Sequence, residues 1–241
     1  MRGTKPLSLV VTVAMTVAAG AQALAASPTT GTQASARPEG AALALNGPTV
    51  PQQLRNQRTV ALTFDDGPSR YTPAILAVLR RHHVRATFCM LGNNAERHPA
   101  LARQVAREGH QLCNHSRDHA DLAREPSRNV RAEVTVTQAQ IRGATGVTPR
   151  TFRFPYGSSD HRTRKIIKRY GLRTLGWDVD PRDWSRPRPT SRELTARVVK
   201  HVRPGSVVLM HDGGGDRSHT AASLDATIRR LQAKGYRFEL A

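Results

Sequence analysis

Short apolar runs alternate with longer amphipathic stretches through the second part of the chain, and this alternation constrains the fold more than any other feature. Strands that alternate with helices imply a parallel sheet, and seven of them favour a closed barrel over an open sheet. The runs predicted as strands are Val60–Phe64, Ala86–Leu91, Gln111–Asn114, Thr151–Phe154, Thr174–Trp177, Val207–Met210 and Tyr236–Leu240. The stretches predicted as helices, with apolar residues at helical spacing, are Thr72–Arg81, Ala100–Glu108, Arg128–Arg142, His161–Tyr170, Arg192–His201 and Ala222–Lys234.

Chemically versatile side chains fall at or just past the C-terminal ends of the predicted strands. Asp65 and Asp66 follow the first strand, His115 the third, Asp180 the fifth and His211 the sixth. In a βα barrel the C-terminal ends of the strands meet at one rim, where active sites are built. We therefore expect a single active site at this rim.

Two adjacent carboxylates and two imidazoles four residues apart indicate a metal site. Asp65 and Asp66 stand at the end of an apolar run, and His115 and His119 follow about fifty residues later. A divalent metal takes such mixed nitrogen and oxygen ligands when it keeps a position open for water. A second carboxylate beside the ligand can accept that water's proton. The pattern predicts metal-assisted hydrolysis, although each pair alone is compatible with a turn or with surface histidines.

Three further segments at strand ends are ambiguous when each is taken alone. The segment from Arg153 to Gly157 is either a proline turn or an arginine held against a carboxylate. Trp184 beside two acids favours a shaped pocket over an exposed loop. His211 stands at a strand end, before a run of three glycines. The agreement of five strand ends favours the functional interpretation.

The first 57 residues differ in composition from the rest. Arg2 and Lys5 precede an apolar run, and Ala23-Leu24-Ala25 offers a small-x-small cleavage site, which together predict a secretion signal over residues 1–25. Residues 26–57 are rich in Ala, Pro, Thr, Gly and Gln and are predicted to be a disordered linker. We therefore expect one domain over residues 58–241, secreted or associated with the cell wall, without stable membrane insertion after cleavage.

The chain is strongly basic. Lys and Arg number 37 against 18 for Asp and Glu, and the net charge of +19 becomes +17 without the two basic residues of the predicted signal. For an exported protein an anionic cell wall is a better candidate partner than nucleic acid, which we do not expect. The basic residues are scattered, so an ordinary solvated surface explains them as well.

The chain has two cysteines, Cys89 and Cys113, in successive predicted strands. Export permits a disulfide, and two buried free thiols account for the residues equally well. The spacing leaves both alternatives open.

With these motifs assembled, residues 58–241 resemble the polysaccharide deacetylases of carbohydrate esterase family 4, the NodB-homology domain. The resemblance rests on five motifs found in the family's order, which together are highly specific. They are Thr63-Phe64-Asp65-Asp66-Gly67, His115-Ser116-Arg117-Asp118-His119, Arg153-Phe154-Pro155-Tyr156, Asp180-Pro181-Arg182-Asp183-Trp184 and Leu209-Met210-His211. The resemblance implies a distorted (β/α)7 barrel that removes acetyl groups from N-acetylated or O-acetylated sugars.

The resemblance also implies a metal-binding half of the site. Asp65 would be the general base, while Asp66, His115 and His119 would hold a divalent metal, most often zinc. Arg153 would orient and tune Asp65.

The other half of the site, by the same resemblance, would act on the acetyl group and the leaving group. Asp180 would tune His211 as the general acid, and the backbone N–H of Tyr156 would help stabilise the oxyanion. Trp184 would pack nearby, and Leu209 would line the pocket for the acetyl methyl group.

The leading hypothesis is a monomeric N-deacetylase acting on N-acetylglucosamine in peptidoglycan or chitooligosaccharides. One alternative is an acetylxylan O-acetyl esterase with the same chemistry. Another is a catalytically inactive barrel that binds anionic cell-wall polymer, against which the complete set of base, metal ligands and acid argues.

Overall fold

The computed structural model describes residues 58–241, so the predicted secretion signal and linker lie outside the described residues. The strands are β1 (Thr59–Asp65), β2 (Thr87–Met90), β3 (Gln111–Asn114), β4 (Thr151–Phe152), β5 (Arg173–Thr174), β6 (Ser206–His211) and β7 (Arg237–Phe238). The helices are α2 (Thr72–Arg81), α3 (Gly92–Arg97), α4 (Pro99–Arg107), α5 (Ser127–Thr145), α6 (His161–Arg169), α7 (Ser191–His201) and α8 (Ser218–Ala233), with a 3-10 turn at Pro155–Gly157. Over residues 58–241, none of these helices has the length and apolar character needed to cross a bilayer.

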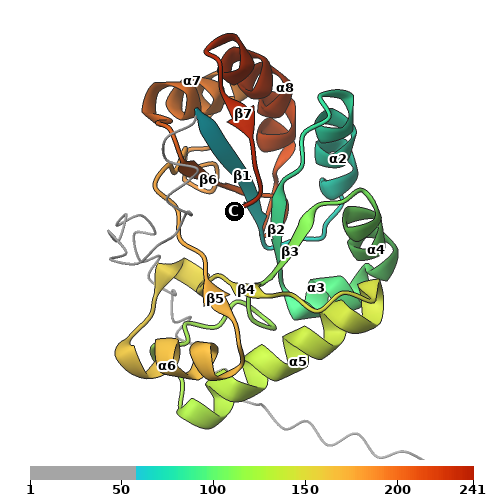
Figure 1. The fold of residues 1–241 in the computed structure, drawn as a ribbon, viewed down its shortest axis with the longest axis vertical. Coiled ribbons are helices and arrows are strands. Elements are labelled where there is room, and N and C mark those ends of the chain that lie inside the picture. Colours follow the sequence, from blue (N-terminus) through green and yellow to red (C-terminus); the bar gives the residue numbers. More distant parts are fainter. Residues whose placement is uncertain (1–57) are drawn as a thin grey trace, which may run out of the picture. The chain divides into compact units, whose positions relative to one another are not determined.

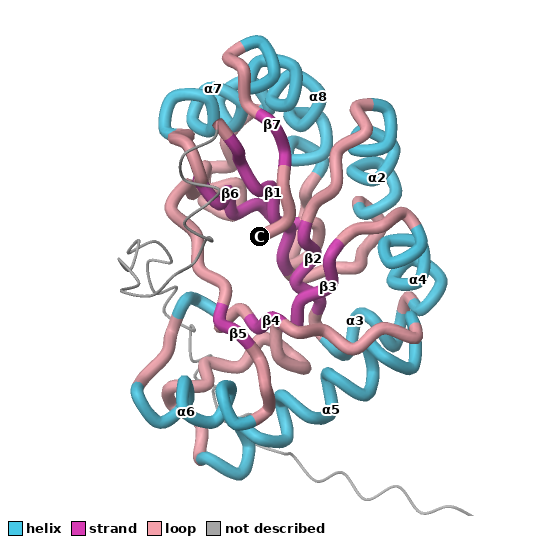
Figure 2. The backbone as a smooth tube through the Cα atoms, in the orientation of Figure 1, coloured by secondary structure: helices cyan, strands magenta, loops and turns pink. Residues whose placement is uncertain are grey.

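The strands form one parallel sheet that curves into a barrel with the helices outside it (Figures 1 and 2). The strand order is β5-β4-β3-β2-β1-β6, and β7 pairs with the start of β1. Over the described residues no ladder joins β5 to β6. Val179, which follows β5, instead forms an isolated parallel bridge with Val208 of β6. The distorted (β/α)7 barrel expected from the sequence is confirmed.

Strand β1 shows how the barrel sorts its side chains. Val60, Leu62 and Phe64 belong to the large apolar cluster that the sheet shares with the helices. Successive side chains of a strand point to opposite faces, so the intervening residues point into the barrel. Thr63 and Asp65 are both completely or almost completely buried there. This alternation of side chains along β1 therefore places Asp65 on the interior side of the rim.

Cys89 and Cys113 are directly paired residues of β2 and β3, and they form a disulfide. Both are fully buried in a small cluster inside the barrel that includes Ala61 and Val207. Of the two alternatives that the sequence left open, the structure selects the disulfide, because the parallel register places the two Cα atoms side by side.

The structure departs from the predicted elements at helix α3 and at the ends of several strands, since β2, β4, β5 and β7 are all shorter than predicted. Helix α3 was not expected, because its six residues are too few to show an apolar repeat. The fifth strand is shorter than predicted and ends at Thr174, so the segment around Trp177 continues as a loop toward β6.

Candidate active site

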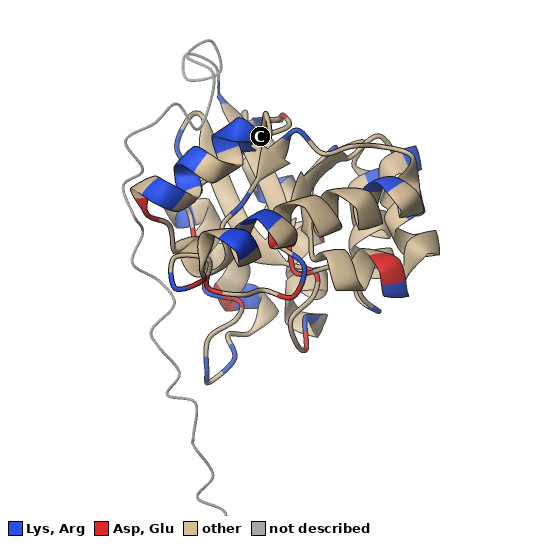
Figure 3. Cartoon of the chain, turned by 90° about the horizontal axis from the view of Figure 1, so that it is seen from below, with Lys and Arg blue, Asp and Glu red and all other residues tan. Residues whose placement is uncertain are grey.

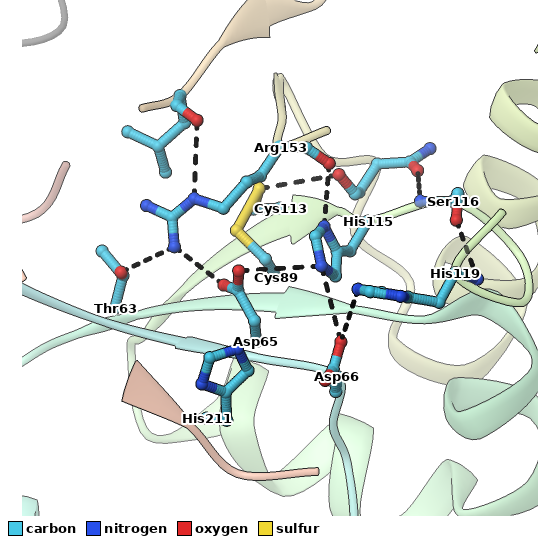
Figure 4. Close-up of polar contacts among 12 residues, drawn as sticks. Thr63, Asp65, Asp66, Cys89, Cys113, His115, Ser116, His119, Arg153 and His211 are labelled. Carbon is cyan, nitrogen blue, oxygen red and sulfur yellow. Dashed lines mark hydrogen bonds and ion pairs between the residues drawn. A yellow bond between two sulfur atoms is a disulfide. The ribbon is translucent and has the colours of Figure 1, made fainter. Parts of the chain in front are cut away.

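Asp65 and Asp66 are neighbours in sequence and both lie close to His115, but each also has a partner of its own. Asp65 is the last residue of β1 and keeps its extended geometry, with its side chain buried inside the barrel. Asp66 has a φ of 70°, a conformation that L-residues seldom adopt, and this turns the chain out of the strand. In Figure 4 both carboxylates approach His115, Asp65 from the side of Arg153 and Asp66 from the side of His119.

Arg153 holds Asp65 in place from inside the barrel. Its side chain is 0% exposed, and its Nη1 donates to Asp65 Oδ1 at 2.8 Å and to Thr63 Oγ1 at 2.7 Å. Nη2 donates to the carbonyl of Gly176 at 3.1 Å. A buried guanidinium with these partners compensates the charge of a buried carboxylate and restricts its orientation. The expected contact between Arg153 and Asp65 is present.

Asp66, His115 and His119 converge as the sequence predicted. Asp66 Oδ1 lies 3.5 Å from His115 Nε2 and 3.4 Å from His119 Nε2, and the three ligand atoms all lie within 4.8 Å of one another. Both distances exceed those of ordinary hydrogen bonds, and Asp66 Oδ1 is buried with no hydrogen-bond partner. A buried, unsatisfied carboxylate oxygen between two imidazoles fits a divalent cation, for which this nitrogen and oxygen set is well suited.

The ring orientation of His115 is fixed by its other nitrogen. Nδ1 lies 2.8 Å from the carbonyl oxygen of Arg153, which can only accept, so Nδ1 carries a proton and Nε2 is directed toward Asp66. Burial opposes the charged form of His115, but Asp65 and Asp66 outweigh it and raise its pKa above the ordinary value. For His119, burial and the neighbouring His115 lower the pKa to about 4.

The two imidazoles come together because the connecting loop is tightly constrained. Ser116 and His119 have φ values of 67° and 70°. The Asn114 side chain accepts the Ser116 N–H at 3.0 Å, and buried Glu133 of α5 accepts the Arg117 N–H at 2.7 Å. Glu133 was not predicted as a site residue, since its position within a helix gives no sign that it reaches the loop.

His211 is paired with Asp183, and the expectation that Asp180 tunes it is wrong. His211 Nδ1 lies 2.7 Å from Asp183 Oδ1, and its backbone N–H donates to Asp183 Oδ2 at 2.9 Å. Asp180 instead accepts the Arg182 N–H at 2.7 Å and the Trp184 indole N–H at 3.3 Å. The loop after β5 turns the buried Asp183 inward, and the sequence alone could not tell which of the two acids reaches the imidazole.

The pair has the electrostatics of an imidazolium and a carboxylate. Burial opposes the charged form of His211, but Asp183 outweighs it and raises the pKa of His211 to about 9. Burial likewise opposes ionisation of Asp183, but His211 outweighs it and lowers the pKa of Asp183. His211 is therefore able to carry a proton at neutral pH.

The remaining predicted residues lie around this centre. Leu209 is buried on β6, two residues before His211 and thus on the same face of the strand. Tyr156 has a φ of 58°, is 50% exposed and packs edge-on against His119 with 4.4 Å between ring centroids. Trp184 is half-buried, with the guanidinium of Arg182 stacked 5.5 Å from its ring centroid.

Asp212 is a buried carboxyl group that sequence reasoning did not identify. Its Oδ2 accepts a hydrogen bond from Thr72 at 2.6 Å, while Oδ1 is buried without a partner. A Cβ atom at Gly67 would overlap this carboxyl group, so only glycine fits there. Burial, with a further contribution from Asp66, raises the pKa of Asp212 to about 7. The one feature of the sequence that pointed to Asp212 is that it directly follows His211.

Comparison with known proteins gives a consistent result. The polysaccharide deacetylase family model matches residues 52–175. The peptidoglycan-N-acetylglucosamine deacetylase PgdA of Listeria monocytogenes is 38% identical over 192 residues, and the match covers 79% of this chain but 39% of that protein. A chitooligosaccharide deacetylase of Azorhizobium caulinodans is 35% identical over 195 residues, covering 76% of this chain and 92% of that protein.

Solved structures agree with the sequence comparison. The crystal structure of the Bc1960 peptidoglycan N-acetylglucosamine deacetylase superposes with a TM-score of 0.74 at 36% identity, covering 77% of this chain and 87% of that one. The family match spans more than half of the chain, and the fold and the converging motif residues are in accord with it. The chain belongs to the polysaccharide deacetylase family.

Proposed function

We propose that the protein is a metal-dependent N-deacetylase that hydrolyses the acetamide of N-acetylglucosamine residues in a cell-wall glycan. One observation carries this proposal. The buried oxygen of Asp66 faces two imidazoles, while Asp65 beside it and His211 on the next strand occupy paired positions of β1 and β6. A base, a metal site and a protonated imidazole thus share one rim, as hydrolysis of an amide requires.

The protein's own residues divide the work of the reaction. A zinc ion or a similar divalent cation held by Asp66, His115 and His119 would act as a Lewis acid toward the acetyl carbonyl and its attacking water. Asp65, oriented by Arg153, accepts the proton of the water as it attacks the carbonyl carbon. The backbone N–H of Tyr156 supports the developing oxyanion, and Leu209 borders the site for the acetyl methyl group.

The leaving group is the sugar amine, which departs poorly unless it is protonated. His211 donates that proton, since Asp183 keeps it cationic at neutral pH. The amine product and acetate then leave the rim. This requirement favours amide hydrolysis over hydrolysis of an ester, for which the leaving alcohol depends less on an acid.

The substrate class follows from charge and from the relatives. Lys and Arg are spread over several helices and loops of the described domain (Figure 3), in a chain with a net charge of +19. A polyanionic wall glycan would be attracted to such a surface, whereas neutral chitin or xylan would not. The relatives include deacetylases named for peptidoglycan and for chitooligosaccharides, and the charge favours peptidoglycan. Secretion to the wall would bring the enzyme to this substrate.

Acetate release from a panel of glycans tests the proposal. Purified protein would be incubated with peptidoglycan sacculi, chitooligosaccharides and acetylated xylan, with and without a chelator. We expect release from sacculi, its loss with chelator and its recovery on adding zinc. Release from acetylxylan alone would identify an O-acetyl esterase, and wall binding without release from any glycan would identify a binding protein.

A further inference from the structure

Arg217 is a buried arginine that no motif singles out, and its contacts converge on the proposed general acid. The side chain is 6% exposed. Its Nε donates to the carbonyl of Gly213 at 2.6 Å, Nη2 to the carbonyl of Gly214 at 3.1 Å and Nη1 to the carbonyl of Asp183 at 3.0 Å. The glycines belong to the segment that continues directly from His211. One guanidinium therefore binds both the chain that carries the imidazole and the chain that carries its carboxylate.

The carboxylate of Asp183 is held from the same direction. Its Oδ2 accepts from Thr220 Oγ1 at 2.8 Å and from the backbone N–H of His211 at 2.9 Å. These two donors leave Oδ1 to the imidazole Nδ1 at 2.7 Å. Thr220 lies in the first turn of α8, and Arg217 immediately precedes that helix. The start of α8 therefore supplies two of the groups that hold Asp183, one at its carboxylate and one at its carbonyl.

Helix stability does not explain a cation at this position. The N-terminus of a helix carries a partial positive charge, so an arginine at the N-cap of α8 is electrostatically unfavourable there. Burying a guanidinium adds a desolvation cost unless its donors are satisfied. The planar guanidinium of Arg217 donates to three carbonyls on two separate segments, and the ammonium group of a lysine could not make the same set of hydrogen bonds. The role of Arg217 is therefore to hold together the two segments that it joins, the glycine segment and the loop that carries Asp183.

We propose that Arg217 is a positioning residue that holds the His211–Asp183 pair in the geometry needed to protonate the leaving amine. The proposal rests on the proposed function, in which His211 is the general acid. Loss of the guanidinium would let the Asp183 loop and the glycine segment move apart. The imidazole would then be misdirected. The glycine segment packs against Asp66, but the Asp66 backbone is also held by Asn94 and by the carbonyl of Cys89. Asp65 is held by Arg153, so we expect the metal ligands and the base to stay in place.

The test compares two substrates that differ in their need for an acid. Arg217→Met and Arg217→Lys would be made in the full chain and assayed, with zinc loaded, on an N-acetylated chitooligosaccharide and on an activated aryl acetate. We expect kcat on the amide to fall about 10- to 100-fold in Arg217→Met, since small misplacements of a catalytic group cost this much. KM should stay unchanged, and kcat on the aryl acetate should change by less than about threefold, because its leaving group needs little protonation.

Arg229→Met is the matched control. Arg229 lies on the same helix, its side chain is 67% exposed, and its ion pair is with Asp225 at 2.9 Å, away from His211. This variant should match the wild type on both substrates. Arg217→Lys should show a smaller loss of kcat than Arg217→Met, again confined to the amide substrate, because lysine keeps the positive charge but not the planar guanidinium group. If Arg217→Met does not fold, Arg217→Lys decides the question.

Equal losses on both substrates, or an unchanged kcat on the amide, would overturn the role of Arg217. His211→Ala, assayed in parallel, distinguishes failure of the positioning role of Arg217 from failure of the proposed function. If His211→Ala loses the amide selectively while the Arg217 variants do not, the positioning role is wrong and the acid assignment stands. If His211→Ala loses both substrates equally, the acid assignment itself is wrong.

Discussion

Asp65 and His211 are direct register partners at the C-terminal ends of β1 and β6. Paired residues of neighbouring parallel strands project to the same face, so a carboxylate and an imidazole emerge side by side on the interior of the rim. Each is held by a different buried group: Asp65 by Arg153, and His211 by Asp183. The two halves of the site can therefore be separated by mutation.

Replacing Asp65 should remove activity without removing the metal. Asp65→Asn should lower kcat about 10²- to 10⁴-fold, the usual contribution of a general base. His119→Ala should instead lose both zinc and activity, because it removes one of the three converging ligands. Elemental analysis of the purified variants, together with acetate release, distinguishes them. Equal loss of zinc from both variants would contradict the division of roles between Asp65 and Asp66.

Replacing His211 should affect amides selectively. His211→Ala should lower kcat about 10²- to 10⁴-fold on an N-acetylated oligosaccharide and far less on an activated aryl acetate. Asp183→Asn should reproduce much of this selectivity, since it removes the charge that keeps His211 protonated. Asp180→Asn is the control, because Asp180 contacts Arg182 and Trp184 rather than the imidazole. An amide-selective loss in the Asp180 variant matching that of Asp183→Asn would refute the pairing seen here.

Zinc binding to the metal-free protein should release about one proton at pH 6, because ligands must be deprotonated to bind a metal. The pKa of His115 is raised, so this group is protonated at that pH, whereas the pKa of His119 is lowered to about 4 and its imidazole is already neutral. Zinc affinity should accordingly decrease as the pH falls. Calorimetry in buffers of different ionisation enthalpy counts the protons. A heat of binding independent of the buffer would contradict this assignment.

Asp212 should make the metal-free protein less stable as pH rises. Its folded pKa of about 7 lies above the ordinary value of 3.8, so the folded state binds the proton more tightly than the unfolded state. Its contribution is fully present below pH 3.8 and is lost as the pH rises through about 7. As the pH rises from 4 to 7, the free energy of unfolding of Asp212→Asn should therefore increase relative to that of the wild type.

Urea unfolding of both proteins across this pH range measures the difference. Asp225→Asn is a useful control with the opposite sign, because the hydrogen bond from His82 lowers the pKa of Asp225. A stability difference between wild type and Asp212→Asn that does not vary with pH would show that Asp212 is not protonated in the folded protein.

The disulfide should stabilise the domain without taking part in the reaction. Cys89 and Cys113 are 24 residues apart, and closing a loop of this size contributes about 3.5 kcal/mol in the chain-entropy description. The double variant Cys89→Ala, Cys113→Ala should unfold at lower urea concentration while retaining zinc and kcat under native conditions. Loss of zinc from the folded double variant would show that the bridge supports the metal-binding loop.

Much of the site was predictable because it depends on local patterns. The apolar runs placed Asp65, His115 and His211 at strand ends, and parallel strands bring such ends to one rim whatever the details of packing. The metal ligands were identifiable because their residue types and their order along the chain are specific. The expected contact of Arg153 with Asp65 is also present, since both lie at ends of strands that enclose the same interior.

What the sequence by itself determined is the set of strands, the rim and the chemical groups on it, because these follow from residue type and from the periodicity of the backbone. Only the tertiary structure decided that Asp183 rather than Asp180 reaches His211, that the cysteines are bonded, and that Arg217 joins two segments at the acid. These contacts link residues more than twenty positions apart. They depend on loop conformations and strand register that no local pattern encodes.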